Sequence, residues 1–391
     1  MKRWGATLGL IAALAACVAK PPAPPLKDHL VLTPVSFGEL ADWDNDRQSE
    51  TLSAFRKSCG ERLKYPDSTE VGPGGIGGKV SNWRAPCTAA NTVTEGDDRA
   101  ARTFFETWFL PYRAANNATQ EGLFTGYYEP ELNGSRTRTG PYQTPLLRRP
   151  PDLIAVELGD FRPDLRGERI AGRVADGRLR PYASRAEIES GALDRYDLGL
   201  FWVDDPIGAF FLQIQGSGRI VLADGTIVRV GYDGQNGQTY LPIGRVLVER
   251  GAFDTDAVTM QGIRTWLMTH PDQAKEVMDR DASYVFFREM TGDGPLGSEG
   301  VVLTPARSLA VDRTYLPLGV PIWLDLAWKD GPNGRMRRLV VAQDSGGAIR
   351  GPVRGDLFWG HGMDAETQAG AMKARGSYVL LLPKSVAPPV S

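Results

Sequence analysis

The sequence predicts a mainly β protein with two barrel-like domains and a few helices near its N-terminus. Strand patterns bounded by turn residues fill the middle of the chain and most of the region after Ser283. There is no fixed-period repeat and no regular alternation of strands with helices, which a βαβ architecture would need. The length of 391 residues allows two domains, and a 42% hydrophobic content is enough for ordinary cores.

The N-terminus is typical of an export signal. Met1-Lys2-Arg3 is basic, and residues 5–16 are apolar but too short to span a bilayer. Small residues precede Cys17 as in a bacterial lipoprotein signal, so we expect residues 1–16 to be removed and Cys17 to be acylated. The alternative is a plain secretory peptide with an incidental cysteine. Prolines between residues 20 and 25 indicate a linker over 17–36.

Three stretches have helical patterns. Leu52, Phe55, Cys59 and Leu63 repeat at helical spacing within residues 37–63. A second helix is expected over 97–109, with Asp97 or Asp98 as its cap, and residues 255–280 return to helix with a break at His270-Pro271. The glycines of 72–78 fit a dinucleotide-binding pattern, but no strand precedes them and no helix follows, so a loop is expected.

The strand patterns lie between and after these helices. Residues 123–130 are expected to form a strand that ends at a turn, and residues 209–215 alternate in the manner of another strand. Asp224-Gly225 lies between two β-prone segments and predicts a hairpin.

Several function classes are disfavoured. A formal net charge of −2 argues against nucleic acid as a partner. His29, His270 and His361 are scattered, so no metal is expected, and Ser217 lacks the first glycine of a nucleophile elbow. No phosphate-binding loop or other cofactor motif is present. Cys59 and Cys87 either pair in an oxidising compartment or stay as two thiols.

Carboxylates remain as the candidates for catalysis. Asp344 ends an apolar strand and precedes Gly346-Gly347, while Asp356 precedes Leu357-Phe358-Trp359. An apolar setting raises the pKa of a carboxyl, which suits Asp356 to general acid catalysis at a glycosidic bond. For Asp344 a catalytic role and a turn-capping role are both open, and for Asp312 turn capping is expected.

These residues, in their joint order, resemble the membrane-bound lytic murein transglycosylase A family. The resemblance rests on Phe124 to Tyr128, Ile214 to Gly218, Tyr284 to Phe287, Ala310 to Arg313 and Asp344 to Trp359. It implies a double-psi β-barrel formed by both ends of the chain, with a second β-barrel inserted. The expected division is 37–130 with 281–385 as the catalytic domain, N-terminal helices included, and 131–280 as the inserted domain.

The resemblance also implies an activity. It is exolytic cleavage of the β-1,4 bond between N-acetylmuramic acid and N-acetylglucosamine in peptidoglycan, with 1,6-anhydro products. The catalytic aspartate of the family matches Asp356, and its companion matches Asp344. The linker between them, residues 350–355, is about one residue longer than in the family. Glycan-contacting positions are expected at Thr125, Tyr127, Gln215, Ser217, Gly346 and Gly347.

The expected setting is a monomer, lipid-anchored through Cys17 on the periplasmic side of the outer membrane. Two other functions stay open. One is an inverting glycoside hydrolase that uses Asp356 as acid and Asp344 as base. The other is a non-catalytic lipoprotein that binds glycan.

Overall fold

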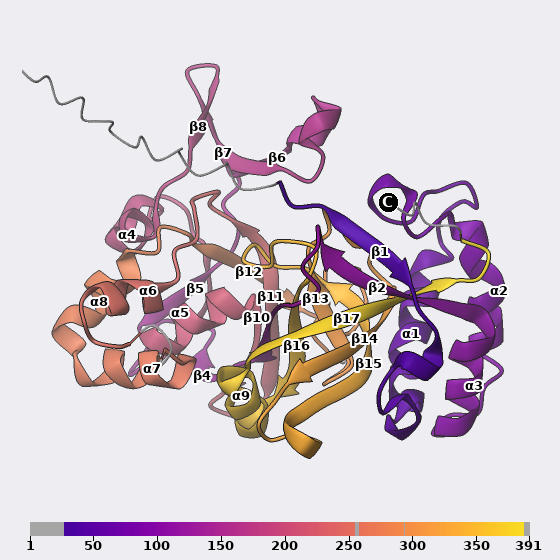
Figure 1. Cartoon of the computed structure of the whole chain (residues 1–391). Helices are drawn as coiled ribbons and strands as arrows, with labels where there is room; N and C mark the ends of the chain where they lie inside the picture. The colour runs from indigo at the N-terminus through magenta and orange to yellow at the C-terminus, as the bar shows by residue number, and fades with distance from the viewer. Residues whose placement is uncertain (1–26, 255–257, 293, 387–391) are drawn as a thin grey trace, which may run out of the picture.

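The computed structural model describes residues 27–254, 258–292 and 294–386 (Figure 1). The signal peptide and Cys17 lie outside these residues. Within them the fold is mainly β, as the sequence predicts, with one eight-stranded, one six-stranded and one three-stranded sheet. No helix in this part of the chain has the length and apolar character needed to cross a membrane.

Six strands of the eight-stranded sheet close into a barrel. The order β17-β14-β15-β13-β16-β3 returns to β17 through a pairing of β17 with β3. The strands are β3 (Gly122–Glu129), β13 (Ser308–Val311), β14 (Pro321–Ala327), β15 (Arg335–Asp344), β16 (Arg354–His361) and β17 (Lys373–Pro383). The barrel therefore combines one strand from the first third of the chain with five from its end.

Two further strands extend this sheet beyond β17. They are β2 (Phe109–Asn116) and β1 (Leu30–Pro34), and both pair in antiparallel fashion. The proline-rich linker expected over 17–36 is thus wrong at its end, because residues 30–34 belong to the sheet. Leu30-Val31-Leu32 is a short β-prone run that follows the prolines.

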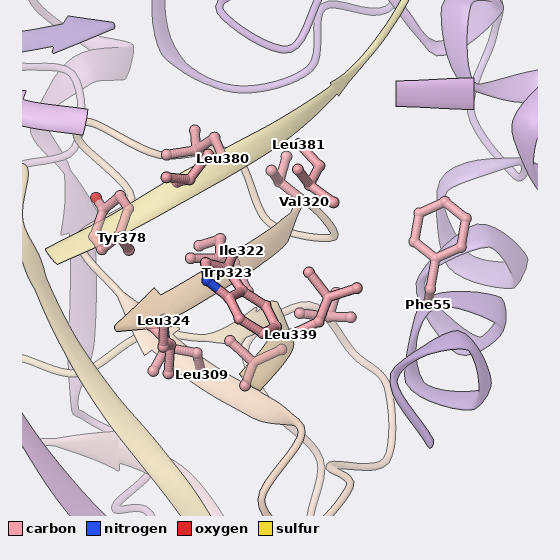
Figure 2. Packing of buried hydrophobic residues seen from close by; sticks show 14 of the residues in the cluster. Phe55, Leu309, Val320, Ile322, Trp323, Leu324, Leu339, Tyr378, Leu380 and Leu381 are labelled. Carbon is pink, nitrogen blue, oxygen red and sulfur yellow. The ribbon is translucent and has the colours of Figure 1, made fainter. Parts of the chain in front are cut away.

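Three helices gather beside the barrel, on the right of Figure 1: α1 (Gln48–Arg62), α2 (Val80–Ala90) and α3 (Asp98–Trp108). Asp97 caps α3 by accepting the Ala100 N–H at 2.8 Å, as predicted. Phe55 of α1 faces the barrel residues of the same core cluster, among them Trp323 and Leu339 (Figure 2). Cys59 of α1 and Cys87 of α2 form a disulfide, with Cα atoms 5.4 Å apart.

The six-stranded sheet has the order β12-β11-β10-β4-β9-β5. Its strands are β4 (Glu131–Ser135), β5 (Thr144–Leu147), β9 (Gly199–Val203), β10 (Ser217–Leu222), β11 (Ile227–Gln235) and β12 (Val285–Met290). The predicted hairpin at Asp224-Gly225 joins β10 to β11. Since β12 pairs with β11, this sheet continues past residue 280, where the sequence suggests that the insertion ends.

The strand expected at 209–215 is wrong, because these residues lie in helix α5 (Pro206–Gln215). Asp205 caps the helix by accepting the Gly208 N–H at 2.8 Å, and Gly216 ends it in the left-handed region at φ 79°. Residues 208–213 are all buried. An alternating pattern cannot identify a strand when apolar residues surround the whole helix.

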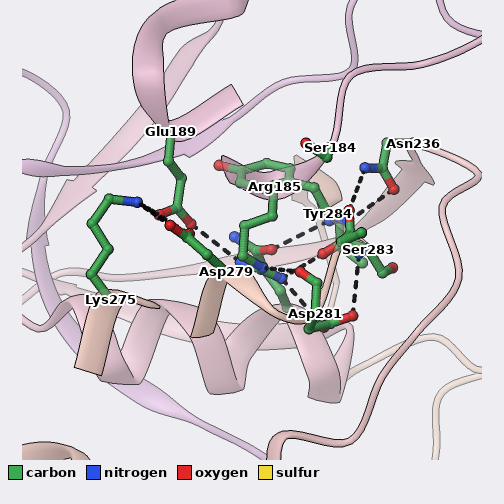
Figure 3. A network of polar contacts seen from close by, with 12 residues as sticks. Ser184, Arg185, Glu189, Asn236, Lys275, Asp279, Asp281, Ser283 and Tyr284 are labelled. Carbon is green, nitrogen blue, oxygen red and sulfur yellow. Dashed lines mark hydrogen bonds and ion pairs between the residues drawn. The ribbon is translucent and has the colours of Figure 1, made fainter. Parts of the chain in front are cut away.

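Other helices lie beside α5, on the left of Figure 1. They are α4 (Arg185–Glu187), α6 (Ile243–Glu249), α7 (Met260–Thr269) and α8 (Pro271–Asp279), with α7 and α8 separated at His270-Pro271 as predicted. Figure 3 shows how Arg185 joins this region together: its Nε donates to the Asp281 carbonyl at 3.0 Å and its Nη2 to that of Ser283 at 2.6 Å.

The remaining elements are a small sheet and one C-terminal helix. Strands β6 (Ile154–Glu157), β7 (Arg169–Ala175) and β8 (Arg178–Pro181) form the three-stranded sheet at the top of Figure 1. Helix α9 (Gly362–Ala371) connects β16 to β17. Neither was predicted from the sequence.

Candidate active site

The two candidate aspartates lie on strands that flank β13. Asp344 ends β15 and Asp356 lies in β16, and both are in register with Ala310 of β13. Two interstrand spacings place their Cα atoms about 9.5 Å apart. The barrel thus brings together two carboxyls that are separated by a loop in the sequence.

Asp356 is held from the neighbouring parallel strand β3. Its register partner there is Thr125, whose hydroxyl donates to Asp356 Oδ1 at 2.8 Å. Arg354 Nη2 in turn donates to the Thr125 hydroxyl oxygen at 2.8 Å. Burial raises the pKa of the Asp356 carboxyl to about 6, against the opposing effects of Arg354 and Thr125, and the charge of Asp344 adds to the rise. This carboxyl is therefore suited to donate a proton near neutral pH.

Asp344 has more hydrogen-bond donors than Asp356. Its Oδ2 accepts from the Tyr127 hydroxyl at 2.8 Å, and its Oδ1 accepts from the N–H groups of Ser298 at 2.9 Å and Ser345 at 2.8 Å. Burial raises the pKa of Asp344, while these three donors oppose the rise. Three donors favour the ionised form, so Asp344 is the better candidate for a lasting negative charge.

Tyr127 lies on the same face of β3 as Thr125, because the two positions are two residues apart. Its ring is 5.2 Å from that of Phe358, the second residue after Asp356. Burial and the Asp344 carboxylate raise the pKa of the Tyr127 hydroxyl well above its usual value, so it stays a donor. Thr125, Tyr127, Asp344 and Asp356 therefore form one cluster.

Gln215 and Ser217 lie where α5 passes into β10. The Gln215 Oε1 accepts the Tyr128 N–H at 3.2 Å, so Gln215 is next to the strand that carries Thr125 and Tyr127. Ser217 begins β10 and is partly exposed. Gln213, in the same helix, is buried and accepts the Val285 N–H at 3.4 Å, which is a structural role.

Gly346 and Gly347 lie in the loop after Asp344, and both are exposed. A side chain at Gly347 would meet no atom within 4 Å, so the loop is open at this point. Asp312 caps a turn, as predicted. Its carboxylate accepts from the Thr314 N–H at 3.0 Å, the Thr314 hydroxyl at 2.7 Å and the Gly351 N–H at 2.7 Å.

Sequence reasoning missed three neighbours of the cluster: Arg354, Ser298 and Tyr240. Arg354 could have been found, because it precedes Asp356 by two positions on one strand and so shares its face. Ser298 acts through its backbone, which has no residue signature. Burial raises the pKa of Tyr240 to about 12, and the Asp281 and Asp356 carboxylates add to the rise, so Tyr240 lies within electrostatic reach of Asp356.

Two other features were considered as sites. In the described ranges, no three His, Cys, Asp or Glu side chains gather in the way that a metal ion requires. A cavity of about 580 Å³ lies against α5 and α8 and is lined by Trp202 and Lys275, among others, but by neither aspartate. The cluster on β3, β15 and β16 therefore remains the site with the clearest chemistry.

Comparison with known proteins identifies the family of this chain. Residues 123–288 match the MltA specific insert domain, and residues 307–382 match the 3D domain. The membrane-bound lytic murein transglycosylase A of Escherichia coli K12 is 34% identical over 284 residues, which cover 70% of this chain and 69% of that protein. The chain belongs to the membrane-bound lytic murein transglycosylase A family.

Solved structures of the family have the same fold as this chain. A membrane-bound lytic murein transglycosylase from Agrobacterium tumefaciens has a TM-score of 0.80 at 32% identity, covering 90% of this chain and 98% of that one. MltA from Neisseria gonorrhoeae has a TM-score of 0.74 at 30% identity, with coverages of 95% and 96%. MltA from E. coli with bound chitohexaose has a TM-score of 0.66 at 27% identity, with coverages of 90% and 94%.

Proposed function

We propose that this protein is an exolytic transglycosylase. It cleaves the β-1,4 bond between N-acetylmuramic acid and N-acetylglucosamine in peptidoglycan and leaves 1,6-anhydro ends. The names of its relatives and the chitohexaose bound to one of them support the substrate class. The observation that carries the chemistry is the enclosed Asp356 carboxyl with a pKa of about 6 beside Thr125.

Asp356 acts first as an acid and then as a base. It protonates the glycosidic oxygen as the bond to C1 of the muramic residue breaks, and positive charge develops at C1 and the ring oxygen. The resulting carboxylate accepts the proton of the C6 hydroxyl, whose oxygen bonds to C1. Because this nucleophile belongs to the substrate, its high effective concentration replaces an external water. No second catalytic carboxyl is required.

Asp344 supports this reaction by its charge and by orienting the Tyr127 hydroxyl. The inverting hydrolase would instead need Asp344 as a base toward water. Such enzymes space their two carboxyls about 6.5–9.5 Å apart to hold that water. Three donors already occupy the Asp344 oxygens and oppose the rise of its pKa, so they would have to give way before Asp344 could accept a proton from water, which favours the transglycosylase.

Thr125, Tyr127, Gln215, Ser217, Gly346 and Gly347 are proposed to bind glycan. Of these, Thr125 and Tyr127 contact the aspartates, and Gln215 contacts the backbone of β3. The exposed glycines leave room for a sugar to approach the loop after Asp344. The proposed catalytic domain comprises 37–130 with 281–385, a double-psi barrel, and the proposed inserted domain comprises 131–280.

Mass spectrometry of products from purified peptidoglycan tests this function. The wild type should release muropeptides that are one water lighter than hydrolysis products, and Asp356→Asn should release none while still binding glycan strands. Reducing muropeptides as the only new products would favour the hydrolase, as would complete loss of turnover in Asp344→Ala. Binding without turnover by the wild type would favour the non-catalytic lipoprotein.

The proposed setting is the periplasmic side of the outer membrane, with a monomer anchored by lipid on Cys17. The expected lipoprotein signal and the membrane-bound relatives support it. Cys17→Ser should move the protein from the membrane fraction to the soluble fraction. Unchanged fractionation of that variant would contradict lipid anchoring at Cys17.

A further inference from the structure

A tight turn over residues 297–301 lies directly on the end of β15. The Gly297 N–H donates to the Val301 carbonyl at 3.0 Å, and the Gly300 N–H donates to the Gly297 carbonyl at 2.8 Å. The Glu299 N–H donates to the Gln343 carbonyl at 3.1 Å, so the turn is attached to the residue before Asp344. A side chain at Gly297 would lie 2.3 Å from that same carbonyl, which shows how closely the turn approaches the strand.

This turn supplies one of the three donors to Asp344. The Ser298 N–H is 2.9 Å from Asp344 Oδ1. Ser298 is exposed, and its hydroxyl adds to the effect of its N–H in favouring the ionised form of Asp344, so both groups act only where the turn holds this residue against the strand. The position of the Ser298 N–H must therefore depend on its neighbours in the turn.

The Glu299 side chain ties the turn to helix α1. Its Oε2 accepts from the Ser58 hydroxyl at 2.6 Å. Arg62, one turn further along α1, favours the charged form of Glu299 and donates to the Leu318 carbonyl. A Cβ at Gly319 would lie 2.1 Å from Arg62 Nη2 and 2.4 Å from Glu299 Oε1, so both side chains converge over this glycine at φ +74°.

The same helix also holds the Asp344 strand itself. Gln343, the residue before Asp344, is fully buried, and its Nε2 donates to the Ser58 hydroxyl oxygen at 2.8 Å and to the Ala54 carbonyl at 2.9 Å. Ser58 thus bonds both to the strand that carries the carboxylate and to the turn that carries its donor. The disulfide from Cys59 to Cys87 fixes this part of α1 to α2.

We propose that Glu299 is a positioning residue for Asp344. Its hydrogen bond with Ser58 fixes the turn in the position where the Ser298 N–H donates to Asp344 Oδ1. Loss of this anchor leaves the enclosed Asp344 carboxylate with two donors instead of three, which disfavours its charged form. The effect on catalysis follows from the proposed function, whereas the effect on Asp344 itself does not.

The test is an NMR titration of aspartates ¹³C-labelled at the side-chain carboxyl in the full soluble chain, with Asp344→Asn to assign the resonance. Glu299→Ala should raise the pKa of Asp344 by about one pH unit, because a hydrogen bond to a charged group has about that worth. Glu299→Gln keeps an acceptor for Ser58 and should restore the wild-type value. Ser58→Ala removes the same bond from the other side, together with the bond from Gln343, and should also raise the pKa of Asp344.

Glu276→Gln is the matched control, since Glu276 is an exposed carboxylate of α8 that pairs with Arg250 and has no contact with the turn. It should leave the Asp344 titration unchanged. Turnover of peptidoglycan should fall about tenfold in kcat for Glu299→Ala with little change in KM, and Glu299→Gln should recover it. An Asp344 pKa that is the same in wild type, Glu299→Ala and Ser58→Ala overturns the proposal. Absence of anhydro products from the wild type would overturn the proposed function alone.

Discussion

The hydrogen bond from Thr125 to Asp356 allows a quantitative prediction about the pH dependence of activity. Thr125→Val removes the hydroxyl that donates to Asp356 Oδ1 and that accepts from Arg354. The bond to Oδ1 favours the ionised carboxyl, so its loss should raise the pKa of Asp356 above about 6, while the charge of Arg354 remains. A hydrogen bond to a charged group contributes about 1.5–3 kcal/mol, which corresponds to roughly one to two pH units.

This shift changes the fraction of Asp356 that is protonated at a given pH. A carboxyl with a pKa near 6 is only about one-tenth protonated at pH 7, and a rise of about one unit makes it about half protonated. The alkaline limb of kcat/KM reports the pKa of the acid in the free enzyme. It should therefore move from near pH 6 to near pH 7 or 8 in Thr125→Val, even if lost glycan contacts lower the plateau.

The assay is the initial rate of release of anhydro-muropeptides from purified peptidoglycan between about pH 4.5 and 9. Thr125→Ser retains the hydroxyl and should keep the wild-type limb. Arg354→Gln removes the other favourable influence on the Asp356 carboxylate and should also move the limb upward. A limb in Thr125→Val that stays near pH 6 or moves lower would refute the assignment of Asp356 as the acid.

Three further predictions concern other parts of the molecule. Replacing Cys59 and Cys87 by alanine opens a loop with a sequence separation of 28. The free energy of unfolding, measured by urea denaturation, should fall by about 3.5 kcal/mol because the unfolded chain gains conformational freedom. A loss below about 1 kcal/mol would show that this gain in freedom is small. Tyr127→Phe removes a donor from Asp344 and should raise the pKa of that carboxyl in the NMR titration, with a downward shift as the contrary outcome. Burial raises the pKa of Glu299 to about 7, above about 4.3 in the unfolded chain, so its favourable contribution to stability is present below about pH 4.3 and is lost as pH rises to about 7. The melting temperature of Glu299→Gln should therefore increase relative to that of the wild type as the pH rises from about 4.3 to about 7. A difference in melting temperature that does not change with pH would contradict the raised pKa of Glu299.

The sequence predicted an element or a site residue correctly where a local sequence signal decides the structure at that position. Helix α3 begins at the predicted cap Asp97, and the Asp224-Gly225 hairpin forms as expected. Asp356 could be chosen from 47 acidic residues because apolar and aromatic neighbours in sequence remain its neighbours in the fold. The family resemblance then related Thr125 to the same site.

The elements and contacts that the sequence did not predict also have physical causes. Helix α5 is buried on most sides, so its periodicity does not indicate its structure, although Asp205-Pro206 and Gly216 mark its two ends. The roles of Ser298 and Glu299 depend on backbone groups and on contacts with α1, more than 240 residues earlier in the chain. Such contacts come from tertiary packing and leave no local pattern.

The pairing of β3 with β16 and β17 has a consequence for when the enzyme becomes active. Thr125 and Asp356 are separated by 231 positions, and the barrel closes only when β17 has paired with β3. Contacts of such high sequence separation form late, because the intervening chain must first be brought together. A nascent chain that has not yet folded β17 onto β3 therefore lacks the closed barrel that brings Thr125 to Asp356, and the capacity to cut glycan should arise only after that strand has folded.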